Sequence, residues 1–196
     1  MKPFHFEKIS DYLTIKCVYH QGMVIYHEHD VCDRIGIVLK GKIKMTHYTF
    51  QGEERVLATL RKDDIFGDFL INSSRPYYPG DLVALEDSEI SFINHQQLES
   101  LLSGHSEFRN YFLNQLSEKA LHFNLHNKIL MQSGLREKIN MWMSYQDCDD
   151  LGRVPISSKE DLANQLNVAR PSLSRELSHM KRDGLIDYDR DFIYIL

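Results

Sequence analysis

The chain has 196 residues, enough for one or two domains that each bury a sizeable core. Apolar residues make up 42% and charged residues 26%, as in ordinary globular proteins, and no apolar run approaches the roughly 20 residues of a membrane span. The net charge of −5 argues against a strongly basic nucleic-acid-binding protein, and the first ten residues, MKPFHFEKIS, lack the apolar stretch of a secretory signal.

Short apolar stretches separated by glycines and polar turns fill the N-terminal half of the chain. Their regular spacing predicts a β-sandwich or barrel. Phe66-Gly67-Asp68 is expected to start a short helical turn, Asp68–Leu70, before the loop Asn72–Gly80. The predicted strands are Cys17–Tyr19, Met23–Tyr26, Arg34–Lys40, Lys42–Tyr48, Arg55–Leu60, Asp81–Ala84 and Ile90–Ile93.

Two helices are predicted to follow the strands. The first runs from Asn94 to Leu102, and a longer one begins at Ser106 and ends near Gln132, before the break at Ser133-Gly134. The long helix carries an apolar stripe near heptad spacing, which needs a partner surface, and we expect both the protein's own strands and a second subunit to supply one. The stripe consists of Phe108, Phe112, Leu116, Phe123 and Leu130, with Ala120 among them.

Ser133-Gly134 is the natural hinge and domain boundary, and a new helix is predicted from Leu135 to Tyr145. Ile139 and Trp142 are expected to be buried on that helix, and Val154–Ile156 to form a small strand. The stretch from here to the end of the chain therefore predicts a separate C-terminal domain.

Ile156 to Arg182 has the pattern of two helices with a tight break between them. Ser157, followed three residues later by Glu160, fits a capping box at the start of the first helix. Asn167 tolerates the left-handed conformation that ends such a helix sharply. The apolar face of this first helix consists of Leu162, Ala163 and Leu166.

The second helix is predicted to begin near Ala169, with Pro171 in its first turn. Leu173, Leu177 and Met180 recur at i, i+4 and i+7 and should be buried. Two helices with a short turn and an outward face of arginine and serine indicate a helix-turn-helix, whose second helix enters the DNA major groove. A helical hairpin with a solvated polar face is the alternative. The outward face carries Arg170, Ser172, Ser174, Arg175, His179 and Lys181.

The last residues predict two short strands, a wing that ends the chain. Leu185–Tyr188 and Asp191–Ile195 flank Asp189-Arg190, after Asp183-Gly184 has ended the helix. Residues 135–196 carry a net charge of −2, from 9 basic and 11 acidic residues, but residues 166–182 carry +3, from four basic residues and Glu176. A locally basic face on an acidic body can bind DNA with few phosphate contacts.

The order of motifs resembles the CRP/FNR family of transcription regulators over nearly the whole chain. The resemblance is carried by Gly22, Asp30, the run Ile37-Val38-Leu39-Lys40-Gly41-Lys42-Ile43, the run Asp64-Ile65-Phe66-Gly67-Asp68 and the winged helix. It implies an α+β fold with an N-terminal double-stranded β-helix (a jelly-roll-like β-roll), a long dimerisation helix and a C-terminal winged helix-turn-helix. The implied domains are 1–104, 105–132 and 135–196.

The resemblance also implies a homodimer that binds double-stranded DNA at an inverted-repeat operator and recruits or excludes RNA polymerase in the cytoplasm. Pro171 stands where many members have glutamate, so the base sequence that those members read is not assumed here. The residues expected to contact DNA are Arg170, Ser172, Ser174 and Arg175, with Ser157 and His179. Those expected at the dimer contact are Phe108, Phe112, Leu116 and Phe123.

The expected effector site departs from the cyclic-nucleotide pattern of the family. Cyclic-nucleotide binders have a glutamate where Asp68 stands, followed about ten residues later by an arginine and a hydroxyl residue that hold the phosphate. Here Tyr78-Pro79-Gly80 occupies that register, so the small-molecule effector is predicted to be something other than cyclic AMP. Candidate effector-binding residues are Phe66, Gly67, Asp68, Tyr77 and Tyr78; the two tyrosines either stack on an aromatic effector or pack the loop onto the roll.

The cofactor is unknown from the sequence, and no metal site is expected. Three dispersed cysteines, Cys17, Cys32 and Cys148, are too few for an iron–sulfur cluster, do not form a disulfide framework and fit a reducing cytoplasm. Haem remains open, because ten histidines are present. Two groups of residues contain the side-chain types that bind metals: His27-Glu28-His29 with Cys32 and Asp33, and His122 with His126. The alternative is an ordinary solvated loop for the first group and a half-exposed helix face for the second.

A second class of function is a small-molecule- or metal-binding enzyme of cupin type, with a C-terminal module for protein contacts. Such an enzyme needs a catalytic constellation. The sequence contains no Ser-His-Asp order, paired carboxylates, glycine-rich phosphate loop or complete metal motif. The sequence therefore favours the regulator over the enzyme.

Overall fold

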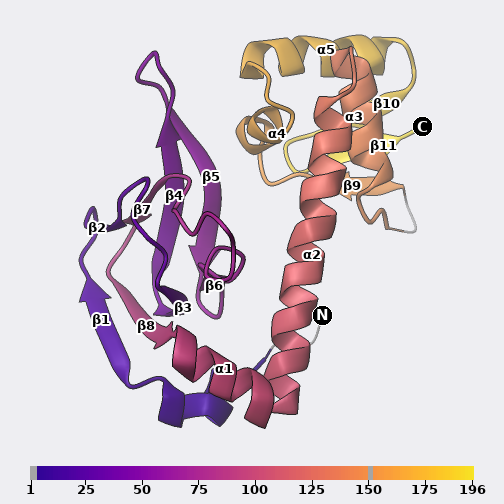
Figure 1. Cartoon of the computed structure of the whole chain (residues 1–196). Coiled ribbons are helices and arrows are strands. Elements are labelled where there is room, and N and C mark those ends of the chain that lie inside the picture. Colours follow the sequence, from indigo (N-terminus) through magenta and orange to yellow (C-terminus); the bar gives the residue numbers. More distant parts are fainter. Residues whose placement is uncertain (1–3, 150–151) are drawn as a thin grey trace. The chain divides into compact units, whose positions relative to one another are not determined.

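The first part of the fold consists of short strands, along several of which buried and more exposed side chains alternate. The structure is a computed structural model that describes residues 4–149 and 152–196. It divides into two compact units, Met1–Leu116 (unit 1) and Ser117–Leu196 (unit 2), each described by itself below (Figure 1). The division falls inside the long helix α2, Ser106–Leu130.

Unit 1 is built on two four-stranded antiparallel sheets, with strand orders β1-β8-β3-β6 and β2-β7-β4-β5. The central strands are apolar on the faces that form the core; Ile35, Ile37 and Ile43 are 0% exposed. The strands are β1 (Ile15–Tyr19), β2 (Val24–Tyr26), β3 (Arg34–Lys40), β4 (Lys42–Tyr48), β5 (Glu54–Arg61), β6 (Ile65–Phe66), β7 (Asp81–Ala84) and β8 (Ser88–Asn94). The jelly-roll-like roll predicted from the sequence is therefore confirmed.

Three of the predicted strands have the bounds of β3, β4 and β7, and the four others differ by one or two residues at one end or at both. Strand β6 was not predicted, because two residues are too few to show alternation. The predicted turn after Phe66 is present: the amides of Leu70 and Ile71 donate to Gly67 O at 3.1 and 2.9 Å.

Helices close one end of unit 1. A 3-10 helix η1 (Phe6–Tyr12), which the sequence analysis did not predict, buries Phe6 and Ile9. Helix α1 (His95–Gly104) begins with a capping box between Asn94 and Gln97. The first turns of α2 complete the core of this unit.

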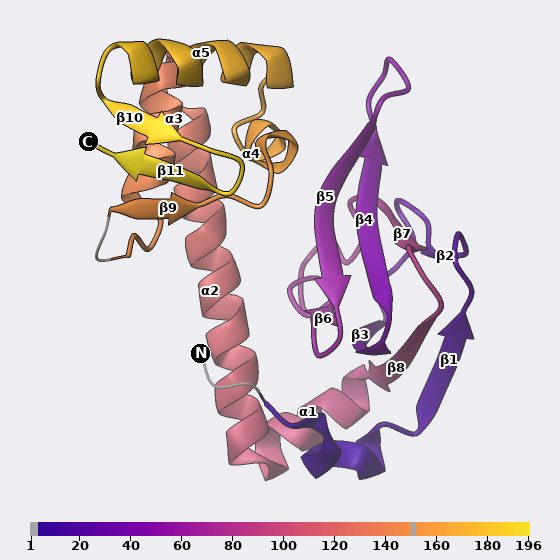
Figure 2. The ribbon, with the colours of Figure 1, turned by 180° about the vertical axis from the view of Figure 1, so that it is seen from behind.

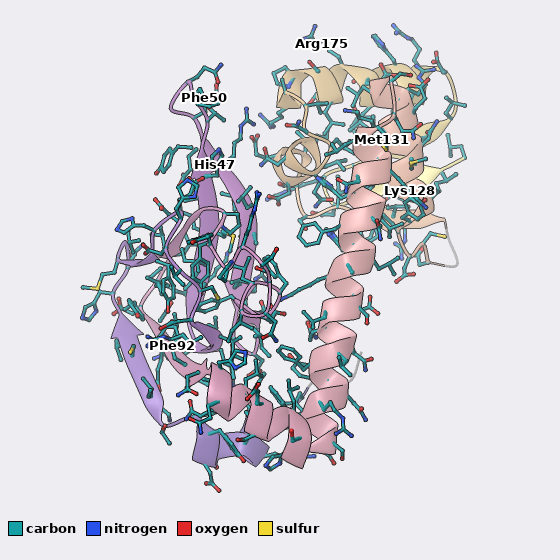
Figure 3. The ribbon with its side chains drawn as sticks, viewed as in Figure 1. His47, Phe50, Phe92, Lys128, Met131 and Arg175 are labelled. Carbon is teal, nitrogen blue, oxygen red and sulfur yellow. The ribbon has the colours of Figure 1, made fainter. Side chains whose placement is uncertain are left out.

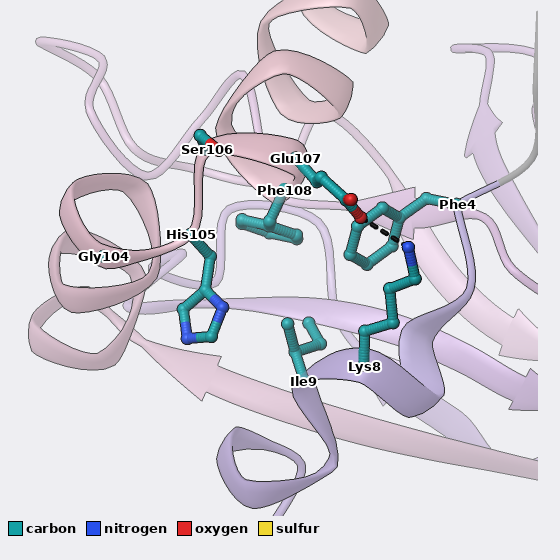
Figure 4. A pocket seen from close by; sticks show the side chains of 8 residues that line it. All are labelled: Phe4, Lys8, Ile9, Gly104, His105, Ser106, Glu107 and Phe108. Carbon is teal, nitrogen blue, oxygen red and sulfur yellow. Dashed lines mark hydrogen bonds and ion pairs between the residues drawn. The ribbon is translucent and has the colours of Figure 1, made fainter.

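A cavity of about 210 Å³ lies between η1 and the junction of α1 and α2 (Figure 4). Phe108 and Ile9 form its apolar wall, and Lys8 Nζ donates to Glu107 Oε2 at 2.5 Å beside it. The two charged side chains of the cavity therefore satisfy each other.

Unit 2 packs helices against a small sheet. Its elements after α2 are α3 (Leu135–Ser144), β9 (Arg153–Pro155), α4 (Lys159–Gln165), α5 (Arg170–Arg182), β10 (Ile186–Tyr188) and β11 (Phe192–Ile195). Figure 2 shows the sheet, whose strand order is β10-β11-β9. The predicted helix-turn-helix and wing are both present, and Asn167 has the left-handed conformation, with φ 51°. Ile139 and Trp142 are buried, as predicted.

The N-cap of α4 lies one residue later than predicted. Ser158, not Ser157, is the N-cap, and its Oγ accepts from the amide of Asp161 at 3.0 Å and donates to the Asp161 carboxylate at 2.8 Å. Both serines precede an acidic residue by three positions, so the spacing alone did not distinguish them. Ser157 is exposed one residue before the cap.

The Ser158 cap yields a stability prediction. Ser158→Ala should lower the free energy of unfolding of unit 2 by ~1 kcal/mol, because the Asp161 amide loses its acceptor. Ser157→Ala, the matched control, should change it by less than about half of that. Urea unfolding followed by the fluorescence of Trp142, the single tryptophan of the chain, reports on this unit. An equal or larger loss for Ser157→Ala would show that the cap is misassigned.

Candidate nucleic-acid interface and roll interior

Helix α5 presents a polar face to solvent because its opposite face is fully buried. Leu173, Leu177 and Met180 are each 0% exposed and form part of the core of unit 2. Arg170 and Arg175 are exposed in the first two turns, and Figure 3 shows Arg175 pointing outward from the helix. The structure therefore brings two of the predicted DNA-facing residues to one accessible surface.

The remaining predicted residues on α5 lie on less accessible or more distant positions. Ser172 and Ser174 are half-buried, so the surface there is close to the helix backbone. His179 is exposed farther along the helix, and its Nδ1 lies 3.7 Å from Glu176 Oε2. His179 therefore lies in the last turn of α5, away from the N-terminal half that carries Arg170 and Arg175.

The two exposed arginines are held only loosely in the absence of DNA. Arg170 Nε lies 3.5 Å from Glu160 Oε2, and both side chains are more than half exposed. Arg175 Nε donates to Pro171 O at 3.3 Å. An exposed ion pair contributes little free energy, so the Arg170 guanidinium can leave Glu160 at low cost.

A groove of about 540 Å³ lies between the start of α4, the start of α5 and the tip of the wing. Its lining includes three cationic side chains: Lys159, Arg170 and Arg190. Lys159 Nζ lies 4.2 Å from the centre of the Tyr188 ring, a cation–π distance. Exposed Ser157 also lines the groove, which gives that predicted residue a place beside the cations.

The wing tip is shaped by Asp189. Its Oδ1 accepts from the amides of Asp191 and Phe192, both at 2.8 Å, and its Oδ2 accepts from the Tyr194 hydroxyl at 2.5 Å. These hydrogen bonds, first that from Tyr194, hold the pKa of Asp189 below its usual value. Arg190 is thereby presented at the tip. The sequence analysis did not assign Lys159 or Arg190; a basic residue between two predicted wing strands is a signal that could have found Arg190.

Arg136 on α3 fixes α5 within unit 2. Its Nε donates to Glu176 Oε1 at 2.7 Å, and its Nη1 lies 2.9 Å from Asp183 Oδ2. The hydrogen bond to Glu176, followed by that to Asp183, raises the pKa of Arg136. A guanidinium that binds carboxylates in the middle and at the end of α5 limits rotation of the recognition helix about its axis.

The predicted effector residues lie mostly inside the roll. Phe66 and Asp68 are 2% and 3% exposed, and the Gly67 between them has φ 78°. Tyr78 is 0% exposed, whereas Tyr77 is 49% exposed. The two tyrosines therefore do not act as a pair: Tyr78 packs the loop onto the roll, and Tyr77 faces outward.

Cys32 and Tyr78 meet beside Gly67. The thiol is 2% exposed and lies 3.4 Å from Arg34 O and 3.6 Å from Gly67 O. Burial raises the pKa of the Cys32 thiol, which disfavours the reactive thiolate. Cys17 and Cys32 are both free thiols, so the structure contains no disulfide between them.

The histidine clusters show carboxylate or ring contacts in place of a metal geometry. His47 Nδ1 lies 3.0 Å from Glu28 Oε1, and His27 Nδ1 lies 3.7 Å from Asp81 Oδ1. Across residues 4–149 and 152–196, no three histidine, cysteine or carboxylate side chains are arranged to hold a metal ion. In the same part of the chain, no helix combines the length and the hydropathy needed to cross a bilayer.

Most of the residues predicted for a dimer contact on α2 are covered by the chain itself, which corrects that prediction. Phe108 and Phe112 are 0% and 3% exposed and belong to the core of unit 1, with Leu116 packed against it. They are covered by their own chain, because spacing alone did not show which stripe of the helix the roll covers. Of the predicted set, Phe123 is the residue that remains exposed, at 57%.

The two matched family descriptions correspond to the two parts of this architecture. Residues 16–105 match the family "Cyclic nucleotide-binding domain", and residues 137–196 match "Crp-like helix-turn-helix domain". The roll followed by a winged helix-turn-helix defines a transcription regulator with a cyclic-nucleotide-binding-like domain, and the two matches do not favour the alternative of a cupin-type enzyme. The chain belongs to the CRP/FNR family of transcription regulators.

Curated relatives and solved structures agree with that assignment. The anaerobic regulatory protein of Bacillus subtilis is 24% identical over 88% of this chain and 75% of its own length. The global nitrogen regulator of Synechocystis is 22% identical over 90% of this chain and 82% of its own. The structure of CprK complexed with OCPA has a TM-score of 0.72 at 16% identity, and covers 96% of this chain and 89% of that one. The c-di-GMP-responsive regulator CLP of Xanthomonas campestris has a TM-score of 0.63 at 16% identity, with 97% and 99% covered.

Gly67 provides a test of packing in the roll. A Cβ there would lie 2.9 Å from Cys32 Sγ and 3.0 Å from Arg34 O, and the residue has positive φ. Gly67→Ala should therefore cost more than the ~1–2 kcal/mol of left-handed strain alone. Gly22→Ala is the matched control, because Gly22 has φ 85° and no atom within 4 Å of the added Cβ. Unfolding followed by near-ultraviolet circular dichroism compares them; equal losses would refute the tight contact.

Proposed function

We propose that this chain is a homodimeric, sequence-specific DNA-binding transcription regulator that recognises an inverted-repeat operator. The observation that carries the proposal is the outward face of α5. Arg170 and Arg175 are exposed there, while the opposite face is fully buried. A rigid helix with arginines in its first two turns has the shape and the donors that the major groove accepts.

Arg175 and Arg170 are the proposed readers of base identity. Each guanidinium can donate two hydrogen bonds to the N7 and O6 atoms of guanine. Half-buried Ser172 and Ser174 allow close approach and offer hydroxyls to phosphate or bases. Pro171 has no polar side-chain atom, so direct readout at its base position is expected to be weak.

The groove at the wing tip is the proposed seat of the DNA backbone. Lys159, Arg170 and Arg190 converge there on a surface that also carries the Ser157 hydroxyl. Cations placed beside a recognition helix bind phosphates without reading sequence and fix the register of the helix on the duplex. Local charge at this groove explains how an acidic chain can bind DNA.

Dimerisation is proposed to use an exposed stripe of α2 and the residue after it. Positions 113, 117, 120, 124, 127 and 131 alternate spacings of four and three, and all six side chains are exposed. Leu113 is 52% and Met131 83% exposed, which is unusual for large apolar residues on a monomer. Asn124 and Asn127 on the same stripe can set the register of a two-helix contact at some cost in stability.

The effector is proposed to differ from cyclic AMP. Tyr78, Pro79 and Gly80 occupy the register of the phosphate-holding residues, and buried Asp68 stands in place of glutamate. CprK is described with OCPA and CLP as responsive to c-di-GMP, so related rolls serve different ligands. RNA polymerase is the further proposed partner and the cytoplasm the proposed location, both on family resemblance.

Selection of bound sequences from a random duplex pool tests the proposed function. The ligand-free protein at near-physiological salt should recover an inverted repeat with half-sites about 10 base pairs apart. If nothing specific is recovered, the selection is repeated with cell extract. A second failure would contradict sequence-specific DNA binding, and recovery of direct or single half-sites would contradict the dimer.

The backbone seat predicts a change in salt dependence. Lys159→Ala and Arg190→Ala should each reduce the slope of log affinity against log salt by ~0.9, because each removes one phosphate contact. Base preference should be unchanged. Fluorescence anisotropy with the selected duplex measures both, with exposed Lys62→Ala in unit 1 as the control. An unchanged slope in both variants would place the backbone elsewhere.

The α2 stripe predicts which substitution separates the subunits. Ala120→Glu places like charges together at the proposed contact and should convert the dimer to monomer at micromolar concentration. His122→Glu, on the other side of the same helix and also exposed, should remain dimeric. Sedimentation velocity distinguishes the two species. A dimer that survives Ala120→Glu and dissociates with His122→Glu would show that another face of α2 forms the contact.

A further inference from the structure

The side chain of Tyr78 lies in the interior of the β-roll. Its ring is 0% exposed and stacks on Tyr26, with ring centres 4.4 Å apart and planes at 23°. The backbone holds it there: Tyr78 N donates to Asp30 O at 3.0 Å, and His29 N donates to Tyr78 O at 2.9 Å. The loop that carries Tyr78 is therefore paired with the strand-like segment opposite and is not a loose flap.

The polar end of the ring lies against Gly67. A Cβ on Gly67 would be 3.2 Å from Tyr78 Oη and 2.9 Å from Cys32 Sγ, so the missing side chain provides the space that the phenol occupies. The Tyr78 hydroxyl makes no hydrogen bond of ordinary geometry, and the thiol of Cys32 is its polar neighbour. Burial raises the pKa of Tyr78, so the phenol is neutral.

An unpaired hydroxyl is unfavourable in an apolar core, where phenylalanine would fill the same space without a polar atom. Tyr78 also belongs to the loop that follows Gly67-Asp68, where the sequence placed the effector residues. The position and the stacking fit an aromatic slot that the chain fills with its own side chain.

We propose that the ring of Tyr78 is an internal ligand of the β-roll, so that the roll adopts its DNA-binding state without a small molecule inside it. The slot between Tyr26 and Gly67 is then a cryptic site for a phenol, which opens when the Tyr78 side chain is removed. The part that concerns DNA rests on the proposed function, whereas the phenol slot does not.

Chemical rescue tests the proposal. Tyr78→Ala leaves a hole of the shape of the lost ring, and an apolar cavity of that kind binds a small aromatic molecule. The variant should unfold at a lower temperature and bind the selected duplex at least about tenfold more weakly. Phenol at millimolar concentration should raise the unfolding temperature and restore most of the affinity.

Matched variants separate the ring from its surroundings. Tyr48→Ala removes a tyrosine that is 52% exposed on β4, and phenol should change neither its stability nor its DNA affinity. Tyr78→Phe keeps the ring and loses the orphan hydroxyl, so it should bind the duplex within about twofold of the natural chain and unfold at a higher temperature. This variant keeps the proposal testable if Tyr78→Ala does not fold.

Three outcomes would overturn the proposal. Undiminished DNA binding by phenol-free Tyr78→Ala would show that the slot does not control the DNA-binding state. Rescue of stability without rescue of DNA binding would reduce the ring to a packing element. Loss of DNA binding in folded Tyr78→Phe would assign the effect to the hydroxyl and not to the ring. Phenol binding by Tyr78→Ala, with no DNA binding by the natural chain under any condition, would instead contradict the proposed function and leave the slot intact.

Discussion

The complete burial of Leu173, Leu177 and Met180 determines which face of α5 is exposed to solvent. Those side chains occupy one stripe of the helix, and their removal from water stabilises unit 2. A rotation of α5 about its axis would expose them and lose part of that stabilisation. Arg170 and Arg175 face outward as a consequence. Arg136 adds a directional restraint, since its guanidinium bonds to Glu176 and to Asp183 at the end of the helix. Two hydrogen bonds from one guanidinium to one base require a fixed geometry, which such a restraint favours.

The roll is governed by a different constraint, the close approach of three groups around Gly67. The Cys32 thiol, the Tyr78 phenol and the Arg34 carbonyl all lie within the space that a side chain at this position would take. The result is an interior filled by the protein's own aromatic residues at the place where the sequence predicted an effector. Deep burial of Cys32 raises the pKa of its thiol and so disfavours the thiolate that redox chemistry requires.

Much of the fold could be predicted from the sequence, because periodicity determines which faces are buried. The 3.6-residue pattern of Leu173, Leu177 and Met180 and the left-handed preference of Asn167 sufficed for the helix-turn-helix. Periodicity did not predict the outcome where two sets of residues fit the same pattern. Ser157 and Ser158 both fit a cap, and α2 carries two stripes of residues. The roll covers the predicted one from Phe108 to Leu116, whereas positions 113–131 of the other stay exposed.

The candidate site was predictable only in part, for a related reason. Arg170 and Arg175 follow from the helix pattern, whereas Lys159 and Arg190 come together with Arg170 only through the fold of the wing. Tyr77 is exposed and Tyr78 is buried because of how the loop pairs with residues 29–32, and that pairing involves contacts far apart in sequence. No local rule distinguishes two adjacent tyrosines in a loop.

The most direct test of the central claim, that the outward face of α5 reads DNA bases, is a double-substitution cycle between Arg175 and a guanine of the selected operator. Each guanine in turn is replaced by 7-deazaguanine, which lacks the N7 acceptor, and Kd is measured by anisotropy for the natural chain and for Arg175→Ala. If Arg175 reads a guanine, one guanine in each half-site should be found whose replacement weakens binding of the natural chain by roughly 5- to 150-fold and leaves binding by Arg175→Ala unaffected. Additive losses at every guanine would show that Arg175 contacts none of them and would contradict the assignment of the recognition face.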